Sequence, residues 1–192
     1  MINLAAGLFV LPFFLFSPLA GQLADKYEKS RLIRIVKAME IVVMTLGVLT
    51  LVFHWWWGLM AVLFLMGTQS TFFGPLKFSI LPQLLHREEL VAGNAQVEMG
   101  TFVAILMGTL LGTLIGGMEN YLPIMAASVL AVAVAGWLCS RQIPVAEPHA
   151  RELRINWNPF TEMLDLVRIA RENKSVWLSI LGVSWFWLLG FQ

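Results

Sequence analysis

The sequence predicts an all-α membrane protein with five full transmembrane helices, a cytoplasmic amphipathic linker helix and a truncated sixth span. Three observations lead to this class. Hydrophobic residues make up 58% of the 192 residues and charged residues only 13%, whereas a soluble domain carries about 25% charged residues. The apolar residues gather in runs of about 20, the length that crosses a bilayer core. All 13 Lys and Arg residues fall in three of the connections between these runs.

Five apolar runs are long enough to span a bilayer, and they define a bundle over residues 1–140. They cover approximately residues 2–20, 35–53, 56–76, 97–118 and 122–140. A further apolar run at 176–192 predicts the start of another span that the chain truncates. We expect no cleavable signal peptide, because no basic segment precedes the first apolar run. The ending inside an apolar run indicates a fragment.

The connections alternate between basic and non-basic, and this alternation predicts the orientation of the bundle. Residues 53–57 and 118–121 carry no Lys or Arg. An excess of Lys and Arg marks cytoplasmic loops, so the three basic connections are predicted inside and residue 1 outside. The three consecutive tryptophans Trp55–Trp57 fit the aromatic belt at the outer interface.

The last basic connection, residues 141–175, is predicted to contain a helix of its own over 159–172. Asn158 before Pro159 is typical of an N-cap followed by proline at the first helical position. Apolar residues then recur at helical spacing at Phe160, Met163, Leu164 and Val167. We expect an amphipathic helix that lies along the inner membrane surface and links two halves of a longer protein.

The stretch from Gly21 to Arg31 combines a glycine with charges of both signs at the predicted inner membrane edge. The residues singled out as a gating motif are Gly21, Leu23, Asp25, Lys26 and Arg31. Gly21 would let another helix approach closely. A lone carboxylate at the membrane edge is costly, so Asp25 is expected to find a basic partner or the positive end of a helix. A pairing made in one conformer only would act as a latch; an ordinary basic loop is the alternative.

These residues resemble the loop motif of the major facilitator superfamily, which joins transmembrane helices 2 and 3. The match departs at Glu28, where the family usually has glycine, and this puts the geometry of the turn in question. The resemblance implies that the five spans are helices 2 to 6, that the run at 176–192 begins helix 7, and that helix 1 is missing.

A stripe of glycines in the fourth span carries a second resemblance. It comprises Gly108, Gly112, Gly116 and Gly117. Glycines four residues apart give a smooth face for tight helix packing. The stripe is similar to the antiporter motif on helix 5 of the superfamily, with Thr113 in place of proline. The missing proline speaks against antiport, and plain packing is the alternative reading.

Few charged residues lie within the spans, and no proton relay is apparent. Glu40 follows Lys37 by three residues, which predicts an ion pair along one helix. Glu98 is expected in the first turn of the fourth span, where the helix dipole favours an acid. Pro75 is expected to break or kink the third span and to direct Lys77 toward lipid headgroups.

Polar side chains near the inner face are candidates for binding a zwitterionic headgroup. They are Lys77, Glu98, Gln69 and Glu40, with Thr68 and Ser70 as weaker candidates. For Lys77 the alternative is snorkelling to the interface, and for Thr and Ser it is hydrogen bonding to backbone carbonyls.

Two segments narrow the resemblance to the lysophospholipid transporter branch of the superfamily, namely residues 74–95 and 184–187. The branch implies a transporter that moves lysophospholipids, chiefly lysophosphatidylethanolamine, across the bacterial inner membrane by alternating access. It also implies partners that re-acylate the substrate: an acyltransferase, an acyl-acyl carrier protein synthetase domain and acyl carrier protein. The alternatives are another exporter of the superfamily and a membrane anchor without transport activity.

The sequence predicts no enzyme activity, cofactor, metal site or nucleic-acid partner in this chain. The net charge is +1, and the three histidines, His54, His86 and His149, are scattered without ligand spacing. Cys139 is the single cysteine, so no disulfide within the chain is expected. No catalytic constellation stands out among the remaining residues.

Overall fold

The structure is a computed structural model that describes residues 2–146, 150, 152–153 and 155–190. The chain divides into two compact units, Met1–Leu153 and Arg154–Gln192, and each is described by itself. Arg151 and Arg154, which the predicted basic connection includes, lie outside the described residues, as do residues 191–192 of the predicted sixth span.

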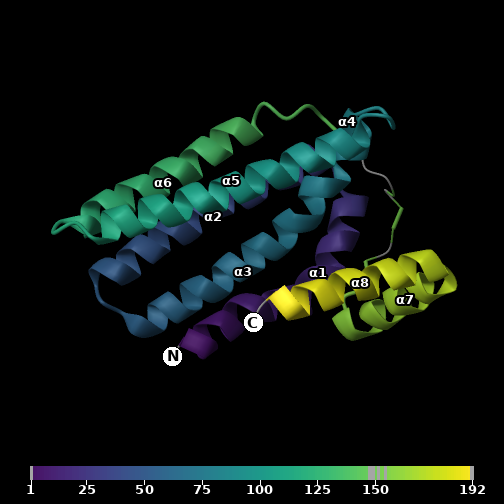
Figure 1. Cartoon of the computed structure of the whole chain (residues 1–192), viewed down its shortest axis with the longest axis horizontal. Coiled ribbons are helices and arrows are strands. Elements are labelled where there is room, and N and C mark those ends of the chain that lie inside the picture. The colour runs from purple at the N-terminus through teal and green to yellow at the C-terminus, as the bar shows by residue number, and fades with distance from the viewer. Residues whose placement is uncertain (1, 147–149, 151, 154, 191–192) are drawn as a thin grey trace. The chain divides into compact units, whose positions relative to one another are not determined.

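The first unit consists of helices (Figure 1). They are α1 (Ile2–Lys26), α2 (Lys29–Val52), α3 (Trp56–Ser79), α4 (Leu81–Leu84), α5 (Leu90–Gly116) and α6 (Tyr121–Ser140). All but the four-residue α4 are long and apolar enough to cross a membrane. The predicted class, an all-α membrane protein with five full spans, is confirmed.

The spans extend further at their basic ends than the apolar runs predicted. The first helix continues to Lys26 and the second begins at Lys29, so Tyr27–Glu28 is the whole connection. The expectation that residues 21–31 form a loop is wrong. An apolar run stops where the bilayer core stops, but Lys, Arg and Gln are good helix formers whose charged ends reach into the interface. The helical backbone therefore continues beyond the hydrocarbon.

The third span does not break at Pro75, and a kink there stays a prediction. α3 runs through Pro75 to Ser79 without a break. Proline removes one backbone hydrogen bond of a helix, but in a membrane the helix remains the best way to satisfy all the other backbone groups.

α3 lies between α1 and α2, while α6 packs on the other side of α2 and contacts α5. An apolar core joins the end of α1, the start of α2, the end of α3 and the segment after α6. Its buried members are Ala24, Ile33, Val36, Leu76, Ile80 and Ala146. The three basic connections therefore begin at the same end of this unit. Which side of the membrane that end faces stays a prediction from the positive charges.

The crossing of α1 and α3 depends on one glycine that the sequence analysis did not single out. Gly67 is buried, and a Cβ atom at this position would collide with the backbone carbonyl oxygen of Phe9 and lie 3.2 Å from Pro12 Cγ. Small residues allow such close approach of helix backbones in membranes. Gly67 therefore sets the distance between α1 and α3.

The second unit contains α7 (Pro159–Glu172) and α8 (Lys174–Gly190), which pack against each other. The bounds predicted for the amphipathic helix agree with those of α7. The side chain of Asn158 accepts a hydrogen bond of 3.1 Å from the backbone N–H of Phe160, as expected of an N-cap. α8 begins at Lys174, two residues before the predicted sixth span. The position of α7 along the membrane surface stays a prediction.

Candidate functional site

The connection between α1 and α2 is built by Glu28, the residue at which the loop motif departs from its family. Glu28 Oε1 accepts hydrogen bonds from the hydroxyl and the backbone N–H of Ser30, and Oε2 accepts one of 3.1 Å from the backbone N–H of Arg31. The backbone of Glu28 is extended, with φ −64° and ψ 119°. The turn therefore needs no glycine, and Glu28 serves as the N-cap of α2.

The segment that follows α6 closes over this connection. The backbone N–H of Ala146 donates to Glu28 Oε1 at 3.2 Å, and Arg34 Nη2 donates to the carbonyl of Ile143 at 2.9 Å. The backbone N–H of Ala150 donates to the carbonyl of Asp25 at 3.0 Å. These bonds tie the α1–α2 connection to the end of α6.

The remaining residues of the gating motif are arranged differently from the expectation. The side chain of Asp25 is exposed and makes no hydrogen bond or ion pair within 4 Å of any described residue. Its charge does interact with the buried Lys29 of α2, a basic partner of the kind expected. Glu28 already binds the first N–H groups of α2, so Asp25 does not bind this helix end. A Cβ added at Gly21 would meet nothing within 4 Å, so no described helix packs closely there. A latch between Asp25 and a group beyond the described residues stays a prediction.

The other three residues of the gating motif lie near the surface of this connection. Leu23 is half-buried, Lys26 lies 5.9 Å from the ring centroid of Tyr27, and Arg31 is exposed.

The hydrogen bonds at Glu28 change its acidity. Partial burial raises the pKa of Glu28, but the Ser30 hydroxyl and the N–H groups of Ala146, Ser30 and Arg31 together outweigh burial and lower the pKa below its ordinary value of 4.5. A depressed pKa in the folded state stabilises the fold above the ordinary value, and that contribution is lost as the pH falls through the depressed pKa.

We therefore expect Glu28→Gln to lower the free energy of unfolding at pH 7 by about 1 kcal/mol, the typical worth of an N-cap. The difference between wild type and variant should shrink as the pH falls below 4.5. Thermal unfolding of the detergent-solubilised protein at several pH values measures both effects. Glu88→Gln is the matched control, because Glu88 is exposed and has no partner among the described residues. An equal loss of stability in both variants would contradict the capping role.

A polar cluster lies between α2 and α3. Lys37 Nζ and Glu40 Oε2 are 2.7 Å apart, with side chains 20% and 18% exposed, so the predicted ion pair is confirmed. Gln69 Nε2 on α3 donates to the same Glu40 oxygen at 3.2 Å. Lys37 Nζ also lies 4.6 Å from the ring centroid of Phe73. Two of the candidate headgroup contacts, Glu40 and Gln69, thus bind each other and join two helices.

The other two candidates, Lys77 and Glu98, lie near each other without being paired. Lys77 Nζ donates to Thr101 Oγ1 on α5 at 2.9 Å and lies 4.6 Å from the ring centroid of Phe78. Glu98 is exposed, three residues before Thr101 on α5, and its carboxylate binds no described residue. Residues three apart share a helix face. The side of α5 that contacts Lys77 therefore also carries an unpaired acid.

The reason given for Glu98 from the sequence is wrong. α5 begins at Leu90, which places Glu98 more than two turns inside the helix, and the dipole effect falls off within the first turn. For Thr68 the structure shows the alternative to headgroup binding, a hydrogen bond to the backbone. Its hydroxyl donates to the carbonyl of Phe64 at 2.8 Å.

The glycine stripe of α5 meets no other helix among the described residues. A Cβ added at Gly108, Gly112 or Gly116 would have nothing within 4 Å, and one at Gly117 would meet only carbonyl oxygens of the preceding turn. None of the described residues of α5 is buried. The packing role of the stripe stays a prediction.

Three contributions to this site escaped the sequence analysis: the cap by Glu28, the bond from Arg34 to Ile143 and the acceptor Thr101. An acid directly before Lys29 and Ser30 is a usable capping signal. The other two join positions 109 and 24 residues apart in the chain, and no local pattern reports such a pairing.

Five apolar helices that hold a few polar side chains between them define a multi-pass helical membrane protein. Comparison with family profiles assigns it further: residues 1–192 match the Major Facilitator Superfamily, and the chain belongs to that family.

Similar proteins with curated names include the "Lysophospholipid transporter LplT" of Enterobacter sp. (strain 638), 27% identical over 190 residues, and that of Photorhabdus laumondii, 26% identical over 184 residues. The protein of the same name from Serratia proteamaculans is 27% identical over 192 residues. Each alignment covers 95% of this chain and 44% of the relative. The chain thus spans less than half the length of these relatives. No solved structure matches it significantly.

Proposed function

We propose that the protein moves lysophospholipids, with lysophosphatidylethanolamine as the main substrate, across the bacterial inner membrane by alternating access. The observation that carries this proposal is the similarity to proteins named lysophospholipid transporters along 95% of the chain. The transported lipid would then be re-acylated by an acyltransferase that works with an acyl-acyl carrier protein synthetase and acyl carrier protein.

The polar groups near the basic end of the bundle support the same proposal. The ammonium of Lys77 has three N–H donors, of which Thr101 takes one among the described residues. A lipid phosphate is an acceptor for the others. The exposed carboxylate of Glu98 on the adjacent turn suits the amine of an ethanolamine headgroup.

The direct test is uptake of radiolabelled lysophosphatidylethanolamine by spheroplasts that produce the full-length protein. We expect uptake well above that of spheroplasts lacking it. An equal uptake in the two preparations would overturn the proposal. Uptake of unrelated amphiphilic drugs, without uptake of the lysolipid, would support a different exporter of the superfamily.

For Lys77→Ala we expect an approximately tenfold loss of preference for lysophosphatidylethanolamine over a lysolipid without a phosphate, with normal membrane insertion. One charge-assisted hydrogen bond of about 1.5–3 kcal/mol accounts for a change of this size. Competition in the spheroplast assay measures the preference. Lys174→Ala is a control, because Lys174 lies in the other compact unit. An unchanged preference in Lys77→Ala would remove this residue from the headgroup site.

For Asp25→Ala we expect uptake to fall at least tenfold while the amount of protein in the membrane stays normal. The side chain makes no hydrogen bond or close ion pair with the described residues, but its charge interacts with the buried Lys29, so thermal unfolding of the variant is measured beside its uptake. If Asp25 forms an ion pair in only one conformer of the gate, the alanine variant loses the pair that stabilises this conformer. Glu88→Ala is the matched exposed-acid control. Full uptake by Asp25→Ala would contradict the gate. A membrane anchor without transport activity would show the same low uptake in the wild type and in both variants.

A further inference from the structure

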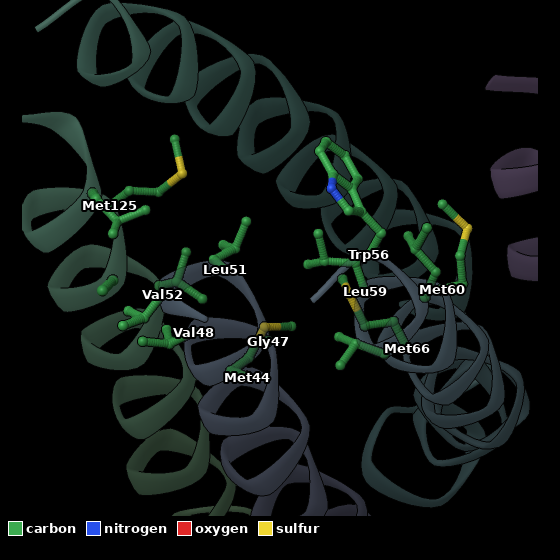
Figure 2. A pocket seen from close by; sticks show the side chains of 15 residues that line it. Met44, Gly47, Val48, Leu51, Val52, Trp56, Leu59, Met60, Met66 and Met125 are labelled. Carbon is green, nitrogen blue, oxygen red and sulfur yellow. The ribbon is translucent and has the colours of Figure 1, made fainter. Parts of the chain in front are cut away.

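An apolar cavity of about 410 Å³ lies between α2, α3 and α6 (Figure 2). Its walls come from the second half of α2, the first half of α3 and the first half of α6, at the end of the unit opposite to the basic connections. Figure 2 shows methionines on all three helices, with Met44, Met60 and Met125 among those labelled, and Trp56 beside them.

A second hollow of about 290 Å³ adjoins this cavity at the same end. The two share Leu51, Trp56, Leu59 and Leu122 as lining residues, so they lie side by side. The second hollow is polar where the first is not. It is bordered by His54, Glu119, Asn120 and Tyr121, which lie in or next to the α2–α3 and α5–α6 connections. Together they form an apolar chamber with a polar mouth.

The chamber of about 410 Å³ is a partly open groove and not a closed cavity. It falls within the range of small-ligand cavities, about 300–1,000 Å³, and flexible methionine walls adapt to an occupant of variable shape. A single acyl chain is an occupant of suitable size and chemistry.

The polar mouth offers hydrogen-bond acceptors and one negative charge. Glu119 is its only formally charged residue when histidine is neutral. Nδ1 of His54 lies 3.2 Å from the carbonyl oxygen of Val52, which can accept a hydrogen bond from a protonated Nδ1. His54 has φ 51°, the one positive φ among the described non-glycine residues. Such conformations concentrate at functional sites.

We propose that the chamber and its mouth form an entry site for a single-chain amphiphile with a primary ammonium headgroup. The acyl chain lies in the apolar chamber and the ammonium binds Glu119. The site deepens the proposed function, on which it rests for the identity of the lipid: lysophosphatidylethanolamine has one acyl chain and one primary amine. The predicted orientation puts the mouth at the outer face, where the lipid would be collected before it crosses.

The test uses the full-length protein in proteoliposomes and lysophosphatidylethanolamine with a diazirine near the end of its acyl chain. After irradiation, peptide mass spectrometry should find the label on the segments that carry Met44, Met60 and Met125. Ala126→Trp fills the chamber and should reduce this labelling at least fivefold. Val132→Trp is the matched control, since Val132 lies on the same helix, is 70% exposed and does not line the cavity.

The headgroup contact is tested with Glu119→Gln. Labelling by the lysophosphatidylethanolamine probe should fall several-fold, while labelling by a lysophosphatidylglycerol probe, which has no amine, should not change. An equal fall for both probes would overturn the assignment of Glu119. Excess unlabelled diacyl phosphatidylethanolamine should compete poorly; full competition would show an ordinary annular lipid site and overturn the proposal.

The outcomes separate this site from the proposed function. Uptake of lysophosphatidylethanolamine by spheroplasts without label in the chamber would overturn the entry site and leave the transport function standing. Label in the chamber with no uptake would support the binding site and count against transport. If Ala126→Trp failed to fold, the map of labelled peptides in the wild-type protein would still decide the proposal.

Discussion

Replacing Glu40 with alanine is expected to lower the free energy of unfolding by about 3 kcal/mol, the lower end of the range for a buried ion pair, because this pair is only partly buried. The change leaves the ammonium of Lys37 without the carboxylate at 2.7 Å and takes the acceptor from the side-chain amide of Gln69. A lone charge in the bilayer is costly. Snorkelling of Lys37 to the interface limits the loss. Thermal unfolding in detergent measures it.

The double variant Lys37→Met with Glu40→Leu should recover most of the lost stability, because removing both partners of a buried pair is often nearly neutral. Glu98→Ala is the control, since this carboxylate lies in a neighbouring span and binds no described residue. A loss in Glu98→Ala equal to that in Glu40→Ala would contradict a stabilising role for the pair. If the double variant is stable but does not transport, the charges serve the substrate as well as the fold.

This cluster illustrates which parts of the site a sequence can predict. The pair of Lys37 with Glu40 follows from helical spacing alone, because both residues are on one helix. The contact of Glu40 with Gln69 depends on how α2 and α3 are aligned across 29 residues of chain. The bond from Lys77 to Thr101 depends in the same way on α3 and α5. Spacing contains no information about such alignment.

The predicted bounds of the spans lie close to the observed ones at the outer ends and further from them at the basic ends. The error at the basic end of α5 led to the wrong explanation for Glu98. α6 begins within one residue of the expected position, whereas α5 begins at Leu90. The hydropathy of a run reports where hydrocarbon begins, but the helix ends where its backbone finds a cap. At α2 that cap is Glu28. In the sequence this residue only marked a departure from the family motif, which put the geometry of the turn in question.

The glycines show a related limit. The sequence analysis favoured the regular stripe at Gly108, Gly112 and Gly116, because four-residue spacing produces a smooth face. The close helix crossing within the described residues instead uses the isolated Gly67. A stripe shows that close packing is allowed, and only a second backbone at contact distance shows that it occurs.

Gly67→Leu is therefore the second change with a large expected effect: a loss of at least about 2 kcal/mol in the free energy of unfolding, within the range for overpacking. The atom that the new side chain would meet is the backbone carbonyl oxygen of Phe9, which cannot rotate away as a side chain can. α1 and α3 would have to separate. Since α1 packs mainly on α3, the separation would weaken the attachment of the whole first span.

A graded series distinguishes this contact from a general intolerance of α3 to larger residues. Gly67→Ala already adds the colliding Cβ and should lower the unfolding midpoint, and Gly67→Leu should lower it further. Gly7→Leu is the matched control on α1, where an added Cβ meets nothing within 4 Å. Equal midpoints for Gly67→Leu and Gly7→Leu would mean that the crossing does not depend on a bare backbone at Gly67. A midpoint that falls only in the Gly67 variants would show that the α1–α3 crossing beside Phe9 depends on the bare backbone at Gly67.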